Sequence, residues 1–100
     1  MVEIHQTANF EKWMKRLKDE NARYIIARRL SRVESGNLGD VKSVGNNVSE
    51  LRIDYGPGYR IYFTWRGKQL IILLAGGVKN SQSRDIKKAQ ELAKEEYNAT

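Results

Sequence analysis

The chain has 100 residues, 40% apolar and 30% charged, with 8 glycines and 1 proline, a composition typical of one small globular domain rather than a disordered or fibrous chain. Its 18 lysines and arginines outnumber 12 acidic residues and give a net charge of +6, which favours a polyanionic partner without identifying it. The absence of cysteine and the single histidine exclude a disulfide framework and a thiolate zinc site, so we expect no structural metal and no cofactor.

The N-terminal part of the chain predicts a strand followed by two helices. Residues 2–7 alternate apolar and polar side chains, the period of a half-buried strand. Apolar residues at i, i+3, i+4 and i+7 from Phe10 then predict an amphipathic helix over about 8–18. Asp19 is the predicted N-cap of a second helix, which we expect to end at Gly36. The short link predicts that the two helices pack antiparallel as a hairpin.

The middle of the chain returns to a period of two residues. A short, weakly patterned strand contains Val41 and Val44, and residues 45–47 (Gly-Asn-Asn) are a hairpin signal. Residues 48–53 predict the next strand, and Tyr55–Gly58 predicts a turn, because proline fixes one dihedral angle and glycine tolerates positive φ.

Two further strands and a helix complete the predicted elements. Residues 59–65 are rich in aromatic and β-branched side chains and alternate cleanly. Residues 69–75 are apolar at successive positions, as in a central strand buried on both faces. The longest apolar run, Leu70–Ala75, is far shorter than the ~20 residues of a membrane span. We therefore expect a cytoplasmic protein without membrane contact. A final helix is predicted over about 82–97.

The element order predicts the fold class. We read it as β-α-α-β-β-β-α, with three consecutive hairpin-connected strands behind a helical hairpin. This order is typical of an α+β domain whose mainly antiparallel sheet carries the N-terminal helical hairpin on one side, followed by a C-terminal helix. We expect residues 1–100 to form a single domain.

Several enzyme classes are excluded by the residues that the chain lacks. It has no cysteine nucleophile, no His-x-x-x-His pair and no phosphate-binding GxxxxGK[ST] loop. His5 is the sole imidazole, so one chain cannot build a paired-histidine nuclease site. Gly76-Gly77 is not a dinucleotide-binding fingerprint, because it precedes a polar loop rather than a buried helix.

A group of cations on the predicted sheet remains as a candidate site. Alternation places Arg60 and Tyr62 on one face of their strand, and a hairpin at the 55–58 turn would bring Arg52 onto the same face. Lys79 follows the end of the central strand and borders that face. Arginine and lysine side chains around a concave surface suit a phosphodiester, whose oxygens accept the forked hydrogen bonds of guanidinium groups.

A purely structural interpretation competes with this one. Arg52 and Arg60 can pair with Glu50 or Asp54 across strands, as surface ions commonly do, and Tyr62 can be a sheet aromatic. Basic side chains elsewhere can decorate helices. These are Lys79 and Arg84 at a helix start, and Arg16, Arg28, Arg29 and Arg32 on a solvated helix face, where partner binding is the alternative.

The chain resembles the phage-derived addiction-module killer proteins, the HigB-type branch of the RelE/ParE toxin superfamily. The most specific match is Gly56–Tyr62 (GPGYRIY) followed by Gly76–Gln82 (GGVKNSQ). The similarity covers nearly the whole chain through the segments Phe10-x-x-Trp13, Ala22-Arg23, Arg29-Leu30, Gly36-Asn37-x-Gly39-Asp40, Glu50–Ile53, Leu73–Ala75 and Asp85–Ala89. It implies a RelE-like fold, which agrees with the predicted element order.

The resemblance also implies a function. It implies the toxin of a type II toxin–antitoxin pair, usually an endoribonuclease that cuts mRNA in the ribosomal A site. The implied reaction is metal-independent attack of a ribose 2′-hydroxyl on the adjacent phosphate, which yields a 2′,3′-cyclic phosphate. The implied partners are the ribosome with its mRNA and a protein antitoxin, commonly a helix-turn-helix DNA binder. The toxin would bind operator DNA only through this antitoxin.

The motif match assigns the catalytic residues. Arg60 and Lys79 fit best and are expected to stabilise the charged transition state, with Glu50 as a candidate general base. Some relatives carry a histidine or tyrosine at the end of the last strand. This chain has Gly76–Lys79 there, which leaves the general acid open.

The same match suggests the substrate-binding residues. Arg52 is expected to hold the backbone phosphate and Tyr62 to position a base or ribose, and Gln82 and Arg84 complete the set.

Two other functions stay open at this point. The first is a non-enzymatic, gyrase-directed growth inhibitor on the same fold, although the presence of Arg52, Arg60 and Lys79 argues against it. The second is a basic module that binds RNA or protein without catalysis.

Overall fold

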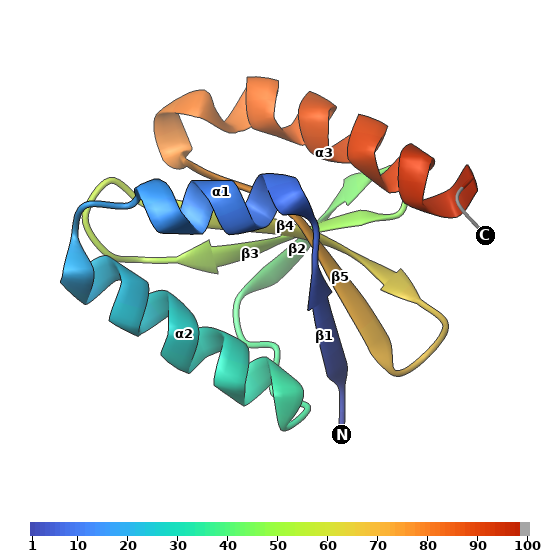
Figure 1. Cartoon of the computed structure of the whole chain (residues 1–100), viewed down its shortest axis with the longest axis horizontal. Helices are drawn as coiled ribbons and strands as arrows, with labels where there is room; N and C mark the ends of the chain where they lie inside the picture. Colours follow the sequence, from blue (N-terminus) through green and yellow to red (C-terminus); the bar gives the residue numbers. More distant parts are fainter. Residues whose placement is uncertain (99–100) are drawn as a thin grey trace.

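The computed structural model describes residues 1–98 as a five-stranded sheet with helices on both faces (Figure 1). In chain order the elements are β1 (Glu3–Gln6), α1 (Ala8–Arg16), α2 (Glu20–Glu34), β2 (Val41–Gly45), β3 (Val48–Ile53), β4 (Tyr59–Arg66), β5 (Leu70–Val78), the 3₁₀ turn η1 (Lys79–Ser81) and α3 (Gln82–Asn98). The α+β class predicted from the sequence is confirmed.

The sheet is mainly antiparallel, as predicted, but it corrects the predicted element order. Its strand order is β1-β5-β4-β3-β2, and β1 pairs parallel with β5 whereas all other pairs are antiparallel. The sheet is therefore mixed, and four strands rather than three follow the helices. Within residues 1–98, no helix combines the length and apolar character that a membrane span needs.

The strand that the predicted order omits is β2, whose weak pattern around Val41 and Val44 reflects an irregular edge strand. Its register with β3 shifts between Ser43 and Gly45, which interrupts the two-residue alternation. The predicted hairpin turn is present, since Asn46 and Asn47 both have positive φ, at 53° and 65°. Positive φ at two successive residues is the geometry of the type I′ turn that joins antiparallel strands.

Both helix caps predicted around α2 are confirmed. The Asp19 side chain accepts hydrogen bonds from the backbone N–H groups of Asn21 and Ala22, and Gly36 follows the helix with a φ of 95°. The predicted antiparallel packing of the helices is not observed. α1 and α2 diverge from their link, and α1 packs most closely on β5 (Figure 1). Both apolar stripes face the sheet, with Phe10 and Ile26 in one core.

The two faces of the sheet have separate cores. Tyr59, Ile61 and Phe63 pack with α1 and α2, whereas Tyr62 packs with Ala89 and Ala93 of α3. The alternation predicted for residues 59–65 is therefore confirmed.

A bulge in β5 determines which of its two glycines lies against which helix. The register between β4 and β5 shifts at Tyr62/Phe63, so that Leu74 and Ala75 lie in the same core. After the shift, Gly76 faces α1, where a Cβ atom would lie 2.2 Å from the Trp13 ring. Gly77 faces α3, where a Cβ atom would lie 1.9 Å from the Asp85 carboxylate. Glycine at both positions allows the two helices to pack directly on β5.

Candidate active site

Three neighbouring strands bring the predicted site residues together at one end of the sheet. Arg52 of β3 lies opposite Arg60 of β4, and Arg60 lies opposite Gly77 of β5. In the adjacent position, Glu50 lies opposite Tyr62. These side chains share the sheet face that α3 covers, as the alternation predicted. Lys79 directly follows β5. We refer to Glu50, Arg52, Arg60 and Lys79 together as the basic cluster.

Glu50 lies at the centre of the basic cluster, and its side chain is fully buried, with 0% exposed. Its Oε1 accepts a hydrogen bond from Arg52 Nε at 2.9 Å, and its Oε2 accepts one from Gln82 Nε2 at 2.7 Å. Arg60 Nε lies 3.8 Å from Oε1. Burial raises the pKa of Glu50, but the hydrogen bonds from Arg52 and Gln82 outweigh it and lower the pKa below its ordinary value. Glu50 is therefore a buried anion beneath the cations.

This placement bears on the role expected for Glu50. A general base needs a free oxygen within hydrogen-bond reach of the proton that it removes. Both oxygens of Glu50 already accept hydrogen bonds from protein groups, and the side chain has no exposed surface. In this conformation Glu50 holds Arg52 and Gln82 in place and is out of reach of a ribose hydroxyl.

Two buried polar atoms beside Glu50 lack a hydrogen-bond partner within residues 1–98: Arg60 Nε and the Tyr62 hydroxyl. The Arg60 side chain is 12% exposed, and its Nη1 donates to the Tyr59 carbonyl oxygen at 3.2 Å. Tyr62 is fully buried, and burial together with the Glu50 charge raises its pKa well above the ordinary value. Tyr62 therefore stays protonated and offers no exposed ring surface to a base.

Lys79 reaches the basic cluster through Gly58. The Lys79 backbone N–H donates to the Gly58 carbonyl oxygen at 2.8 Å. A Cβ atom at Gly58 would lie 3.3 Å from Lys79 Cβ and 3.5 Å from Arg60 Nη1, so Gly58 lies between the base of the Lys79 side chain and the Arg60 guanidinium. Its φ of +80° is a conformation that favours glycine. The exposed Lys79 and the half-exposed Arg52 thus flank the more buried Arg60.

Asp85 is a site residue that the sequence reasoning missed. Its carboxylate is 14% exposed, lies against Gly77 and accepts a hydrogen bond from Ser81 Oγ at 2.5 Å. Its charge also contributes to the raised pKa of Tyr62. The sequence feature that could have revealed this contact is the Gly76-Gly77 pair, because glycine within a buried strand indicates that another group approaches closely.

The remaining predicted site residues, Gln82 and Arg84, have different surroundings. Gln82 is half-buried and donates to Glu50, so it ties the start of α3 to β3. Arg84 has an 83% exposed side chain, and its Nε lies 3.8 Å from Asp85 Oδ1. Arg84 is therefore free to reach a bound anion, whereas Gln82 is engaged inside the protein.

One predicted surface residue is in fact an anchor. Arg29 was assigned to a solvated helix face with Arg16, Arg28 and Arg32, but its side chain is half-buried. It donates to the carbonyl oxygens of Leu38 at 3.1 Å, Asp40 at 3.0 Å and Arg52 at 2.6 Å. Arg29 was misassigned because helical spacing does not reveal carbonyl groups that a distant loop and strand bring to the helix.

Comparison with known proteins relates the chain to a phage-derived group. The family model described as "Phage derived protein Gp49-like (DUF891)" matches residues 12–98, which include the whole basic cluster. A protein of Haemophilus influenzae, described as an "Uncharacterized protein", is 45% identical over 94 residues. That alignment covers 94% of this chain and 95% of the relative. Both matches extend well beyond the motifs of the site.

Proposed function

The chain belongs to the Gp49-like family of phage-derived proteins, and from this premise we propose that it is the toxin of a type II toxin–antitoxin pair, an endoribonuclease that cuts mRNA on the ribosome. The phage origin of the family and the resemblance to addiction-module killer proteins of RelE-like fold support the toxin role. The observation that supports RNA cleavage is the basic cluster, in which Arg52 and Arg60 lie against the buried Glu50 and Lys79 follows the neighbouring strand β5.

The basic cluster suits a reaction in which negative charge accumulates on a phosphate. In the proposed reaction, the ribose 2′-oxygen bonds to the adjacent phosphorus and the bond from phosphorus to the 5′-oxygen breaks. The 2′-hydroxyl loses a proton and the leaving 5′-oxygen gains one, so the products are a 2′,3′-cyclic phosphate and a 5′-hydroxyl. Guanidinium and ammonium groups stabilise the pentacoordinate transition state because its oxygens carry more charge than those of the substrate.

Each predicted site residue has a place in this proposal. Arg60 and Lys79 stabilise the transition state, and the half-exposed Arg52 holds the neighbouring backbone phosphate. Glu50 positions Arg52 through its hydrogen bond and pairs with Arg60 at 3.8 Å.

The outer residues support the same site. Gln82 fixes Glu50 from the other side, and the exposed Arg84 contacts RNA further along the chain. Tyr62 fills the space beneath the cluster and shapes it, so it acts on the substrate only through its neighbours.

The proposed partners follow from the toxin role. A protein antitoxin, commonly a helix-turn-helix DNA binder, would neutralise the toxin in the cytoplasm, and operator DNA would be bound through the antitoxin. The substrate would be mRNA in the ribosomal A site.

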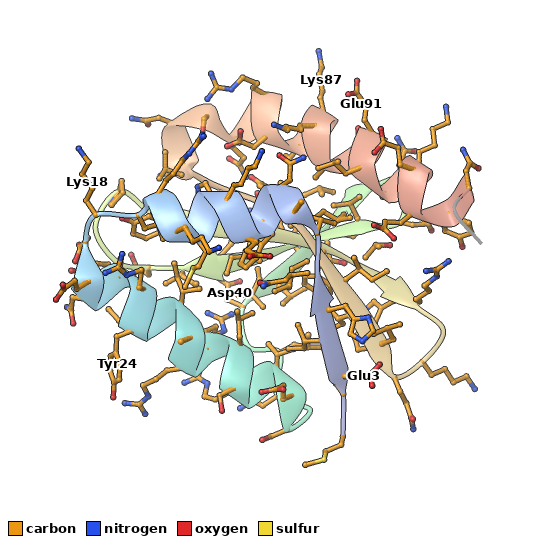
Figure 2. The ribbon with its side chains drawn as sticks, in the orientation of Figure 1. Glu3, Lys18, Tyr24, Asp40, Lys87 and Glu91 are labelled. Atoms are coloured by element: carbon orange, nitrogen blue, oxygen red, sulfur yellow. The ribbon has the colours of Figure 1, made fainter. Side chains whose placement is uncertain are left out.

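Controlled expression without an antitoxin tests the proposal. The unmodified protein should arrest bacterial growth, and primer extension on a reporter mRNA should show cleavages spaced by codons. Arg60→Ala and Lys79→Ala should each slow cleavage on the order of a hundredfold, the usual effect of removing one transition-state donor. Lys87→Ala, which removes an exposed cation from the outer face of α3 (Figure 2), should change neither readout.

Two further assays on the same protein, gyrase supercoiling and RNA binding, separate the competing functions. Growth arrest without codon-spaced cleavage, together with inhibited gyrase supercoiling, would replace the endonuclease with a non-enzymatic inhibitor. A chain that binds RNA but neither arrests growth nor cleaves it would be a binding module.

A further inference from the structure

A groove of about 410 Å³ lies between α2 and the end of β3. Ile53, one of its lining residues, belongs to the core under α1 and α2, whereas Arg52 points to the opposite face, toward α3. The groove is therefore separated from the basic cluster by the thickness of the sheet. This separation makes it a second surface rather than an extension of the proposed catalytic site.

The rim of the groove carries positive charge that the protein itself does not neutralise. Arg28 and Arg32 are exposed and one helical turn apart on α2, so they face the same side. Within residues 1–98, neither forms an ion pair with a carboxylate. Burial lowers the pKa of the neighbouring Arg29, and the charge of Arg32 lowers it further.

The groove combines charged residues with a small apolar floor. Ile53 is buried at its base, and Ile25 is half-buried beside it. Tyr24 forms an exposed aromatic wall, 59% accessible, and the Arg28 guanidinium lies 5.8 Å from its ring centroid. Figure 2 shows Tyr24 pointing away from α2 toward the outside of the molecule. Exposed tyrosine and arginine around an apolar floor are typical of protein-binding surfaces.

We propose that this groove, lined by Tyr24, Ile25, Arg28, Arg32 and Ile53, binds an acidic segment of a partner protein that inserts an apolar side chain against Ile25 and Ile53. Carboxylates of the segment pair with Arg28 and Arg32. A peptide fits better than RNA for two reasons. Ile25 and Ile53 at the floor offer a phosphate backbone no favourable contact, and Asp54 in the lining repels a uniformly negative polymer. The proposal is independent of RNA cleavage, because it concerns binding on the other face.

An NMR titration of the full-length protein tests this proposal. The probe is a short amidated helical peptide with glutamates on one side and leucines on the other, and an oligouridylate of equal net charge serves as the RNA probe. We expect the peptide to bind with a Kd of about 1 mM or tighter and to shift the amide signals of Tyr24, Arg28, Arg32 and Asp54. The signals of Arg52, Arg60 and Lys79 should move little.

Two variants and a matched control identify the surface. Arg28→Glu/Arg32→Glu should weaken peptide binding by about tenfold or more, and Tyr24→Ala should weaken it severalfold without a change of charge. Lys87→Glu/Lys88→Glu changes the net charge equally, on exposed positions of α3, and should leave affinity within about twofold. Circular dichroism checks that each variant is folded.

Several outcomes would overturn the proposal. These are no peptide binding at millimolar concentration, equal losses in both charge-reversed pairs, and peptide-induced shifts confined to the basic cluster. Tighter binding of the oligouridylate in this groove would assign the surface to RNA instead. Loss of ribonuclease activity has no bearing on any of these readouts, so the two proposals fail separately.

Discussion

At the scale of single side chains, Glu50 couples the stability of the fold to pH. Its pKa is lowered in the folded protein from an ordinary value of 4.5. A carboxyl group of this kind stabilises the fold above its unfolded pKa, and that stabilisation is lost as the pH falls through the folded pKa. The free energy of unfolding should therefore decrease below about pH 4.5, in part because Glu50 takes up a proton when the protein unfolds.

Glu50→Gln tests this linkage. The substitution removes the buried counter-charge of Arg52 and Arg60, so urea unfolding at pH 7 should show a loss of about 1–3 kcal/mol. Between pH 5 and about pH 3, the variant should lose less stability than the unmodified protein, because it has one linked carboxyl group fewer. Glu91→Gln, on the outer face of α3 (Figure 2), is the control and should follow the unmodified protein. Identical pH profiles for all three proteins would contradict the assigned role of Glu50.

Gly77 is the second residue whose substitution has a defined physical consequence. A Cβ atom there would lie 1.9 Å from Asp85 Oδ2, so Gly77→Ala must displace the carboxylate and the start of α3. We expect a loss of about 1–3 kcal/mol in urea unfolding, the usual range for overpacking. Asp85→Ala combined with Gly77→Ala should recover part of that loss, since the nearest remaining atom, Ser81 Oγ, lies 3.3 Å away. Strictly additive effects would show that the two residues do not meet.

Among helices and strands, the attachment of α2 to the sheet depends on Arg29. Its guanidinium donates to carbonyl oxygens of the 38–40 loop and of β3. Arg29→Ala should therefore destabilise the fold by about 2–3 kcal/mol in urea unfolding and increase hydrogen exchange in β2 and β3. Arg28→Ala, one residue away and exposed, should change stability by less than about 0.5 kcal/mol. Equal effects of the two substitutions would mean that Arg29 is only a surface residue of the helix, as the sequence predicts.

Local patterns predict regular elements well and irregular ones poorly. The alternation in residues 59–65 correctly assigned the faces of β4, and Asp19 and Gly36 correctly bounded α2, because these signals act within a few residues. The parallel pairing of β1 with β5 was missed, since it joins strands that lie far apart in the sequence, such as Glu3 with Leu70. The bulge that places Gly77 against α3 depends on the same long-range packing.

The candidate site shows the same limit. The face shared by Arg52 and Arg60 followed from strand alternation, which the register confirms. The burial of Glu50 did not, because it depends on α3 covering that face and on Gln82 donating to the carboxylate from 32 positions away in sequence. An acidic residue in an alternating strand looks solvent-exposed until the tertiary partners are known.

Across the molecule, two groups of cations lie on opposite faces of the sheet, and salt dependence distinguishes their partners. If Arg52 and Lys79 contact phosphates, oligouridylate affinity should fall with salt, and Arg52→Ala/Lys79→Ala should reduce the slope of log K against log salt by about 0.7 for each charge removed. Arg28→Ala/Arg32→Ala removes the same number of charges from the opposite sheet face and should leave that slope unchanged, because screening limits charge effects to about 10 Å at 0.1 M salt. Fluorescence anisotropy of labelled oligouridylate at several salt concentrations measures all three proteins. A slope that falls equally in both double variants would mean that RNA covers both surfaces, and the groove beside α2 would then be part of the RNA interface.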